Sequence, residues 1–347
     1  MRNDIATFVG IDVGDTSSVL FALDRQGQRV ALRKVDTDEE GLDRGLRDLP
    51  SPVRVALEVG THSPWMSAFL TEQGYEVVVG NARKLRLIYG ATNKQDHVDA
   101  EKLARLARAD VTLLHPVRHR TRAAQADLAV VRARAHLVAM RTGAVTLVRG
   151  MVKSFGGRLR SCATESFARV AAEQVPAGLR PALAPVLEVI AELTRLIRQS
   201  DVQLKEMARD KYPQTQALLQ VHGVGTLTAL SMILTLEDPG RFRKSRDVGP
   251  ALGLVPRRDQ SGDVDKQLSI TKTGDPYLRV LLVEAAHMAM GPKAPPSDLK
   301  SFGERIASRG GKRGRKRAIT AVARKLAVLL HRLWVTQAPY IPVRKTA

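Results

Sequence analysis

The chain has almost no cysteine, no long apolar run and an excess of basic over acidic side chains. Its one cysteine, Cys162, excludes a disulfide scaffold and a cysteine-based zinc site. No run of about 18 or more apolar residues is present, so a membrane span is not expected. The opening MRNDIATFVG lacks the charged-then-apolar pattern of a secretion signal. We therefore expect a soluble, intracellular protein.

Positive charge is what the chain has in abundance. Lys and Arg number 55 against 35 Asp and Glu in 347 residues, and the 44% apolar content excludes a disordered basic tail. Residues 1–120 hold 17 basic and 17 acidic side chains, 121–210 hold 14 and 8, and 211–347 hold 24 and 10. The surplus therefore lies in the later two thirds. Such a surplus is found where the proteins of an organism are basic in general, but it is also typical of a protein that binds a polyanion, most often nucleic acid.

The first third alternates short apolar strands with helices. The apolar and β-branched runs predict strands at 6–13, 18–23, 29–35, 53–59 and 76–80. Helical spacing of apolar residues predicts helices at 36–49, 64–73 and 96–109. This βββαβαβα order predicts a mixed α/β domain whose sheet is partly antiparallel.

Two long amphipathic helices are predicted next, at 121–152 and 183–207, with an irregular stretch at 153–180 between them. Their apolar residues recur at spacings of three and four, which fits either an antiparallel pair within the chain or an oligomerisation arm.

The last part is predicted to be mostly helical. Residues 216–236 indicate a helix, a glycine turn and a second helix, and 278–290 and 318–335 indicate further helices. Residues 249–278 are rich in Gly, Pro and Asp and are expected to be mostly loop. We divide the chain into domains at 1–112, 113–214 and 215–347.

Four carboxylates in the first domain form a pattern. Asp12 lies in the first apolar strand, Glu58 ends another, and Asp96 and Asp99 share one side of a helix start. An ion pair or the helix dipole explains each one alone. Together, in this fold, they can converge on one point, where carboxylate oxygens suit Mg²⁺ or Mn²⁺. Two such ions would support phosphoryl transfer.

The segment 10–16, GIDVGDT, has a rival interpretation as the first phosphate loop of an actin-like or sugar-kinase ATPase. We rank it lower because the chain has no convincing second nucleotide loop. The pair formed by Asp96 and Asp99 also has no part in that site.

Two features of the basic region indicate phosphate contacts. The turn VHGVGT at 221–226 resembles a helix-hairpin-helix turn, in which Gly223 and Gly225 let backbone N–H groups approach a phosphate. Ser261 lies in a loop among cations; such a serine is usually a turn former, but cations beside it would allow it to attack a phosphate. The predicted basic nucleic-acid contacts, including a run at 309–317 expected to be flexible, are Arg257, Arg258, Lys272, Arg279, Lys312, Arg313, Arg315, Lys316 and Arg317.

These motifs in this order resemble the insertion sequence 110 transposases, which include bridge-RNA-guided recombinases and are similar to Piv-type DNA invertases. GIDVG with Asp12, ALEVG with Glu58 and KQDHVDA with Asp96 and Asp99 resemble the family's DEDD signature. HGVG, GLVPR, the SG beginning at Ser261 and KTG resemble its C-terminal domain. The resemblance covers about residues 6–335. Departures are a Gln before Asp96 and Asp-Val-Gly in the first motif, and neither changes a carboxylate.

The resemblance implies a RuvC-like (RNase H-type) first domain, a coiled-coil arm and a mostly α-helical C-terminal transposase domain. In it the four acids would hold Mg²⁺, and Ser261 would form a covalent phosphoserine link to DNA. It further implies a dimer or tetramer, with the acids of one subunit completing a site with the serine of another, and a structured bridge RNA that pairs with donor and target DNA. Such a protein would be cytoplasmic and associated with the nucleoid.

The sequence leaves two other functions open. One is a metal-dependent RuvC-like nuclease or junction resolvase that uses water and the four acids, without a serine nucleophile. The other is a non-enzymatic nucleic-acid binding protein.

Overall fold

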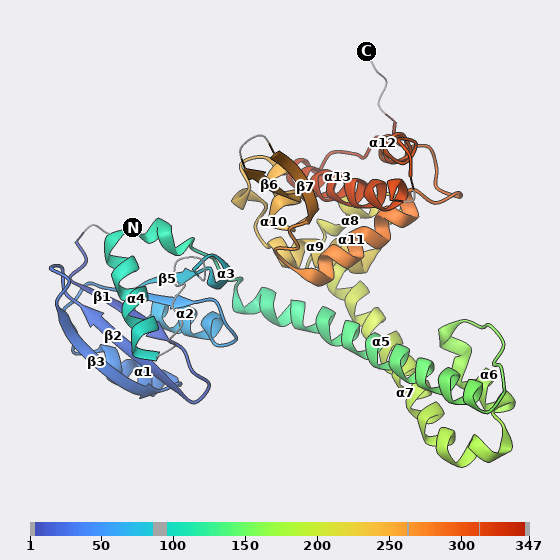
Figure 1. Cartoon of the computed structure of the whole chain (residues 1–347), viewed down its shortest axis with the longest axis horizontal. Coiled ribbons are helices and arrows are strands. Elements are labelled where there is room, and N and C mark those ends of the chain that lie inside the picture. Colours follow the sequence, from blue (N-terminus) through green and yellow to red (C-terminus); the bar gives the residue numbers. More distant parts are fainter. Residues whose placement is uncertain (1–3, 86–95, 262–263, 312, 344–347) are drawn as a thin grey trace. The chain divides into compact units, whose positions relative to one another are not determined.

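The computed structural model describes residues 4–85, 96–261, 264–311 and 313–343. The chain folds into two compact units, 1–122 and 123–347 (Figure 1). Within the described residues, no helix combines the length and the apolar content needed to cross a membrane.

Five strands form one mixed sheet in the first unit, in the order β3-β2-β1-β4-β5. The strands are β1 (Thr7–Asp12), β2 (Ser17–Leu23), β3 (Arg29–Asp36), β4 (Val53–Glu58) and β5 (Glu76–Gly80). Strand β2 pairs antiparallel with both β1 and β3, whereas β4 pairs parallel with both β1 and β5. This confirms the predicted mixed α/β domain.

Helices cover both faces of this sheet because its strands are apolar on both sides. Odd-numbered residues of β1 and β4, such as Val9 and Leu57, pack in one core with α1 (Glu39–Leu46) and α2 (Ser63–Glu72). The opposite face packs against α4 (Asp96–Ala109), which lies over the sheet in Figure 1. Two short helices, α3 (Ala82–Leu85) and η1 (Val111–Leu114), complete that side.

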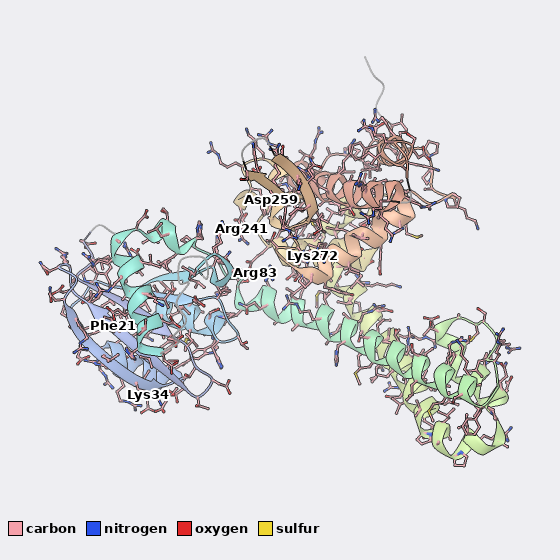
Figure 2. The ribbon with its side chains drawn as sticks, viewed as in Figure 1. Phe21, Lys34, Arg83, Arg241, Asp259 and Lys272 are labelled. Carbon is pink, nitrogen blue, oxygen red and sulfur yellow. The ribbon has the colours of Figure 1, made fainter. Side chains whose placement is uncertain are left out.

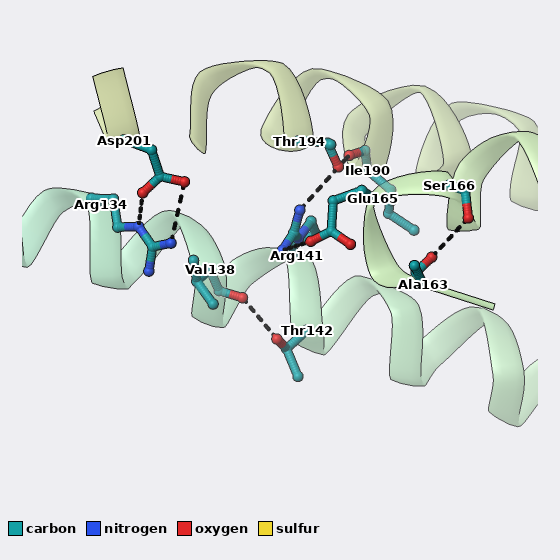
Figure 3. Close-up of polar contacts among 10 residues, drawn as sticks. All are labelled: Arg134, Val138, Arg141, Thr142, Ala163, Glu165, Ser166, Ile190, Thr194 and Asp201. Carbon is teal, nitrogen blue, oxygen red and sulfur yellow. Dashed lines mark hydrogen bonds and ion pairs between the residues drawn. The ribbon is translucent and has the colours of Figure 1, made fainter. Parts of the chain in front are cut away.

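The second unit begins with a long pair of helices, α5 (Arg122–Ser154) and α7 (Arg180–Asp210). Arg134 pairs with Asp201 at 2.9 Å, and further along α5 Arg141 donates to Thr194 at 3.3 Å (Figure 3). The partner on α7 thus moves toward the start of that helix as the chain advances along α5, so the two helices run antiparallel. The intrachain alternative is therefore the one observed, and a supercoiled arm remains a prediction.

A helix that the sequence did not predict closes the far end of this pair. The 153–180 stretch was expected to be irregular but contains α6 (Phe167–Gln174). Phe167 is buried with Val148 of α5 and Leu183 of α7. One large aromatic side chain in an otherwise mixed segment thus docks α6.

The remaining helices of the second unit pack around one apolar core, which includes Leu218, Met232, Leu282 and Leu326. They are α8 (Thr215–Leu219), α9 (Thr226–Leu236), α10 (Val248–Ala251), α11 (Pro276–Ala289), α12 (Asp298–Ala307) and α13 (Gly314–Thr336).

Two expectations for this region are wrong. The supposed loop at 249–278 contains an antiparallel hairpin of β6 (Pro256–Ser261) and β7 (Val264–Ile270). The basic run at 309–317 is not all flexible loop, because α13 begins at Gly314 and includes the run's last residues.

Candidate active site

Asp12 and Glu58 lie side by side at one edge of the sheet. The register of the parallel strands pairs Ile11 with Leu57, so the next residues along, Asp12 and Glu58, are neighbours at the carboxyl ends of β1 and β4. Side chains alternate along a strand, and Ile11 and Leu57 face the α1–α2 core. Both carboxylates therefore belong to the face that α4 covers.

Helix α4 runs antiparallel to β1 and brings its two acids to the same edge. Near the start of the strands, Arg54 Nη1 donates to the carbonyl of Ala107 at 3.2 Å. Further along β1, Gly10 packs so tightly on α4 that an added Cβ would lie 2.0 Å from the carbonyl oxygen of Ala100. The N-terminal turn of α4, with Asp96 and Asp99, therefore extends toward the carboxyl ends of β1 and β4.

The structure brings the ends of β1 and β4 and the start of α4 to one edge of the sheet, and a metal site formed by the four acids there stays a prediction. Among the described residues, no group of three or more His, Cys, Asp or Glu side chains is gathered closely enough to hold a metal ion. Asp99 Oδ1 instead lies 3.2 Å from Lys102 Nζ, one turn further along α4. The donor chemistry fits a hard divalent cation, because all four side chains offer carboxylate oxygens from three elements that meet at one edge.

A histidine that the sequence analysis missed connects the two turns that follow these strands. His62, in the turn after β4, lies with Nε2 3.2 Å from Oδ1 of Asp15, in the turn after β1. Trp65 Nε1 donates to His62 Nδ1 at 3.0 Å, so Nε2 carries the proton that faces Asp15. The only signal in the sequence was a His four residues after the strand-ending Glu58.

Next to His62 in the sequence, a serine at the start of α2 contacts a second histidine near the end of the first unit. The buried Ser63 Oγ lies 2.9 Å from His119 Nε2. Burial, and then the nearby charge of Arg120, lower the pKa of His119, so its imidazole is neutral near pH 7.

Ser261 lies at the tip of the β6–β7 hairpin, where β6 ends. The side chains of β6 are exposed along its whole length, Ser261 included. Arg258, on the same strand, pairs with Asp265 of β7 at 2.6 Å, and Arg257 Nη2 lies 3.4 Å from Ser269 Oγ. Ser261, Arg257 and Arg258 thus share one exposed strand, whereas Lys272 lies beyond the end of β7, and the action of Ser261 on a phosphate stays a prediction. Figure 2 labels Asp259 on this ribbon.

The hairpin is fixed at its base by a tight crossing of two segments, which we call the hairpin neck (Gly253 and Lys272–Gly274). Gly253 and Gly274 have φ of +67° and +70°, and an added Cβ on Gly253 would lie 2.3 Å from the backbone nitrogen of Thr273. Only glycine tolerates both the positive φ and this close approach. Lys272 is also in the left-handed region, at φ +56°, and is labelled in Figure 2.

Arg279 fixes this neck from helix α11. Its Nη1 donates to the carbonyls of Leu252 at 2.9 Å and Thr273 at 2.6 Å, one on each side of the hairpin. Its guanidinium, predicted from the sequence to contact nucleic acid, thus makes contacts within the protein.

The other predicted nucleic-acid contacts are distributed over the second unit. Gly223, at φ +89°, turns the chain against α11, where an added Cβ would lie 2.7 Å from the carbonyl of Ala285. Gly225 precedes α9 with open space around it. Arg313, Arg315, Lys316 and Arg317 are exposed at the start of α13, whereas Lys312 lies outside the described residues.

Comparisons with known proteins decide the family. Residues 9–156 match a family model described as a transposase, and residues 215–303 match one described as transposase IS116/IS110/IS902 family. The chain is 30% identical over 263 residues to the transposase for insertion sequence element IS1111A of Coxiella burnetii, covering 73% of this chain and 70% of the relative. The chain belongs to the IS110 family of transposases. It is also 29% identical over 287 residues to the transposase for insertion sequence element IS1328 of Yersinia enterocolitica, covering 82% of this chain and 84% of the relative.

This transposase is therefore an enzyme that acts on DNA by phosphoryl transfer. The first matching region spans the sheet edge with its described acids, and the second spans the glycine turn and the Ser261 hairpin. The first region's DEDD-type domain indicates that the transposase uses a divalent metal. A DNA substrate also accounts for the net charge of +20, since phosphates are bound mainly by Lys and Arg.

Proposed function

We propose that this transposase cuts and rejoins the DNA of an insertion sequence through a covalent phosphoserine at Ser261, assisted by four metal-binding carboxylates. The observation that carries the proposal is the meeting of Asp12, Glu58 and the N-terminal turn of α4 at one sheet edge. An arrangement of acids at strand ends is what a RuvC-like, RNase H-type nuclease domain requires. In this proposal Asp12, Glu58, Asp96 and Asp99 hold Mg²⁺, or Mn²⁺ in its place.

The bound metal would supply positive charge against the phosphate oxygens and the leaving oxygen. The chain's own residues supply the rest. In the first unit, the carboxylates would hold the metal ion that binds the phosphate, and His62 holds the two turns beside them through Asp15. In the second unit, the exposed hairpin presents Ser261 with Arg257 and Arg258 on the same strand, whose charges favour the approach of a phosphodiester.

The proposed step conserves phosphodiester bonds. The Ser261 hydroxyl oxygen attacks the scissile phosphorus, and an O–P bond forms while the bond from phosphorus to one deoxyribose oxygen breaks. The serine proton leaves to a base, and the freed deoxyribose oxygen takes up a proton. Rejoining reverses these events with a deoxyribose hydroxyl of another DNA end as nucleophile, so no external energy source is needed.

A guide RNA would complete the account of specificity. Lys and Arg contacts with phosphates fix a protein on nucleic acid but carry no base sequence. We propose that a structured bridge RNA, by pairing with donor and target DNA, selects the sites, and that the protein works as a dimer or tetramer. The chain's basic second unit, with exposed Arg315 and Lys316 on α13, supports an additional polyanion partner.

The test compares Ser261→Ala with Ser154→Ala, an exposed serine at the end of α5, in a strand-exchange assay with donor DNA, target DNA and the element's RNA. We expect Ser261→Ala to abolish exchange and the covalent protein–DNA species on denaturing gels, and Ser154→Ala to keep both. Asp12→Asn should abolish cleavage while leaving DNA binding intact. Cleavage that persists in Ser261→Ala but is lost in Asp12→Asn would instead identify a metal nuclease that activates water.

A further inference from the structure

A cleft in the second unit lies between the serine hairpin and helix α13. It has a volume of about 970 Å³ and is formed by β7, α12 and α13. Its floor is apolar and includes Leu268, Ile270, Phe302, Ile306 and Val328. Leu268 is 44% exposed, although it is a large apolar side chain. A cleft with an exposed apolar floor is typical of a binding site.

One wall of the cleft is strongly cationic. Helix α13 and the residue before it contribute Arg313, Lys316, Arg317, Arg324 and Lys325. Intervals of four and seven residues place Arg313, Arg317 and Arg324 along one face of the helix. None of the five cations forms an ion pair with a described residue, and no acidic side chain is among the described residues that line the cleft. This wall therefore faces solvent with uncompensated positive charge.

The combination fits a single nucleic-acid strand better than a duplex. A duplex stacks its bases inside and offers an apolar floor nothing to contact. A single strand exposes base faces, which rest on apolar and aromatic side chains while the phosphates meet cations. Phe302 already has Lys325 Nζ 4.4 Å from its ring centroid, so the floor and the cationic wall are adjacent.

The direction of the cleft connects it to the proposed reaction. Strand β7 lines the cleft at Leu268 and runs back to Val264, which pairs with Ser261. Four residues of strand span about 13 Å. We propose that this cleft binds a single strand of DNA next to the scissile phosphate and leads it to Ser261. The assignment to DNA rests on the proposed function, whereas the cleft's fit to a single strand does not.

The test measures binding without cleavage, in the full chain carrying Ser261→Ala. The probe is a fluorescein-labelled 12-nucleotide single-stranded DNA, followed by anisotropy between 50 and 200 mM salt. We expect a double variant that combines Lys316→Gln with Arg324→Gln to weaken binding at least tenfold. The slope of log affinity against log salt should fall by about 1.4, or about 0.7 for each phosphate that the protein no longer neutralises. Arg198→Gln, an exposed arginine of α7, should change neither quantity.

A substitution in the apolar floor and two further nucleic-acid probes complete the experiment. Leu268→Ser should weaken single-strand binding about fivefold with no change in salt slope, whereas Leu147→Ser, which is 51% exposed on α5, should not weaken it. The cleft variants should weaken the binding of an RNA of the same sequence, or of a DNA duplex, less than that of the single strand. Unchanged binding in the cleft variants would overturn the proposal, as would a loss confined to RNA or to the duplex. Strand exchange that persists in Ser261→Ala would refute the serine mechanism but leave this binding result readable.

Discussion

Replacing Gly10 by alanine tests the contact that holds α4, and with it two of the four acids, against the sheet. The new methyl would lie 2.0 Å from the carbonyl oxygen of Ala100 and 2.5 Å from the nitrogen of Ala104. Both are backbone atoms, so the helix itself has to move. Overpacking costs about 1–3 kcal/mol, and the close backbone contacts favour the upper end. A gain of about 0.5–1 kcal/mol from replacing glycine in a strand offsets part of it.

The expected net loss in the free energy of unfolding is about 2 kcal/mol, or about 1 M in the urea midpoint at an m-value of about 2 kcal/mol/M. Trp65 reports on the first unit, and a Trp334→Phe background removes the signal of the second. The matched control is Gly60→Ala, because an added Cβ there meets nothing within 4 Å. Metal-dependent cleavage should fall together with stability. A Gly10→Ala midpoint equal to that of Gly60→Ala would refute the close packing of α4 on β1.

Three further substitutions test other parts of the structure. The side chain of Arg54 is 9% exposed and pairs with Glu76 at 2.7 Å. In urea unfolding, Arg54→Met should lower the free energy of unfolding by about 3 kcal/mol, because it leaves the Glu76 carboxylate without this partner. Adding Glu76→Gln should restore part of that loss. Burial, and then the hydrogen bond donated to Asp127, raise the pKa of Tyr212 to about 12 from an ordinary 10.0. The unfolded chain loses this proton first, so stability should fall between about pH 10 and pH 12, and Tyr212→Phe should flatten that fall in urea unfolding followed by circular dichroism. Arg279→Gln removes two hydrogen bonds at the hairpin neck; amide hydrogen exchange there should rise about tenfold while exchange in α13 stays constant.

The first sheet was predictable because its strands are short, apolar and bounded by turn residues. The predicted strands at 6–13 and 53–59 run one residue beyond the observed ends of β1 and β4, so the pattern placed Asp12 and Glu58 within one residue of the strand ends. The register that makes these two acids neighbours was not predictable, since β1 and β4 pair in the sheet although two other strands lie between them along the chain. Nor was the direction of α4, which follows from two contacts between residues far apart in the sequence, Gly10 with Ala100 and Arg54 with Ala107.

The serine hairpin was not predicted because its first strand lacks the apolar pattern that revealed the strands of the first sheet. Its first strand, PRRDQS, has no buried side chain, so the sequence carries no apolar alternation to detect. The strands form because their backbones pair and because the neck glycines force the chain back on itself. Helix α12 was missed because it follows a segment rich in proline, and only Leu299 and Gly303 are buried on it.

Peptide mapping of a trapped reaction can show directly whether Ser261 becomes linked to DNA. The full chain is incubated with metal, RNA and a donor DNA nicked just beyond the cleavage site, so that the released end is lost and rejoining is blocked. After nuclease and protease digestion, mass spectrometry locates any nucleotide bound to protein. We expect a nucleotide phosphate on Ser261, absent from the Ser261→Ala and Asp12→Asn proteins. Cleaved DNA with no nucleotide on Ser261, or with one on another residue, would contradict it.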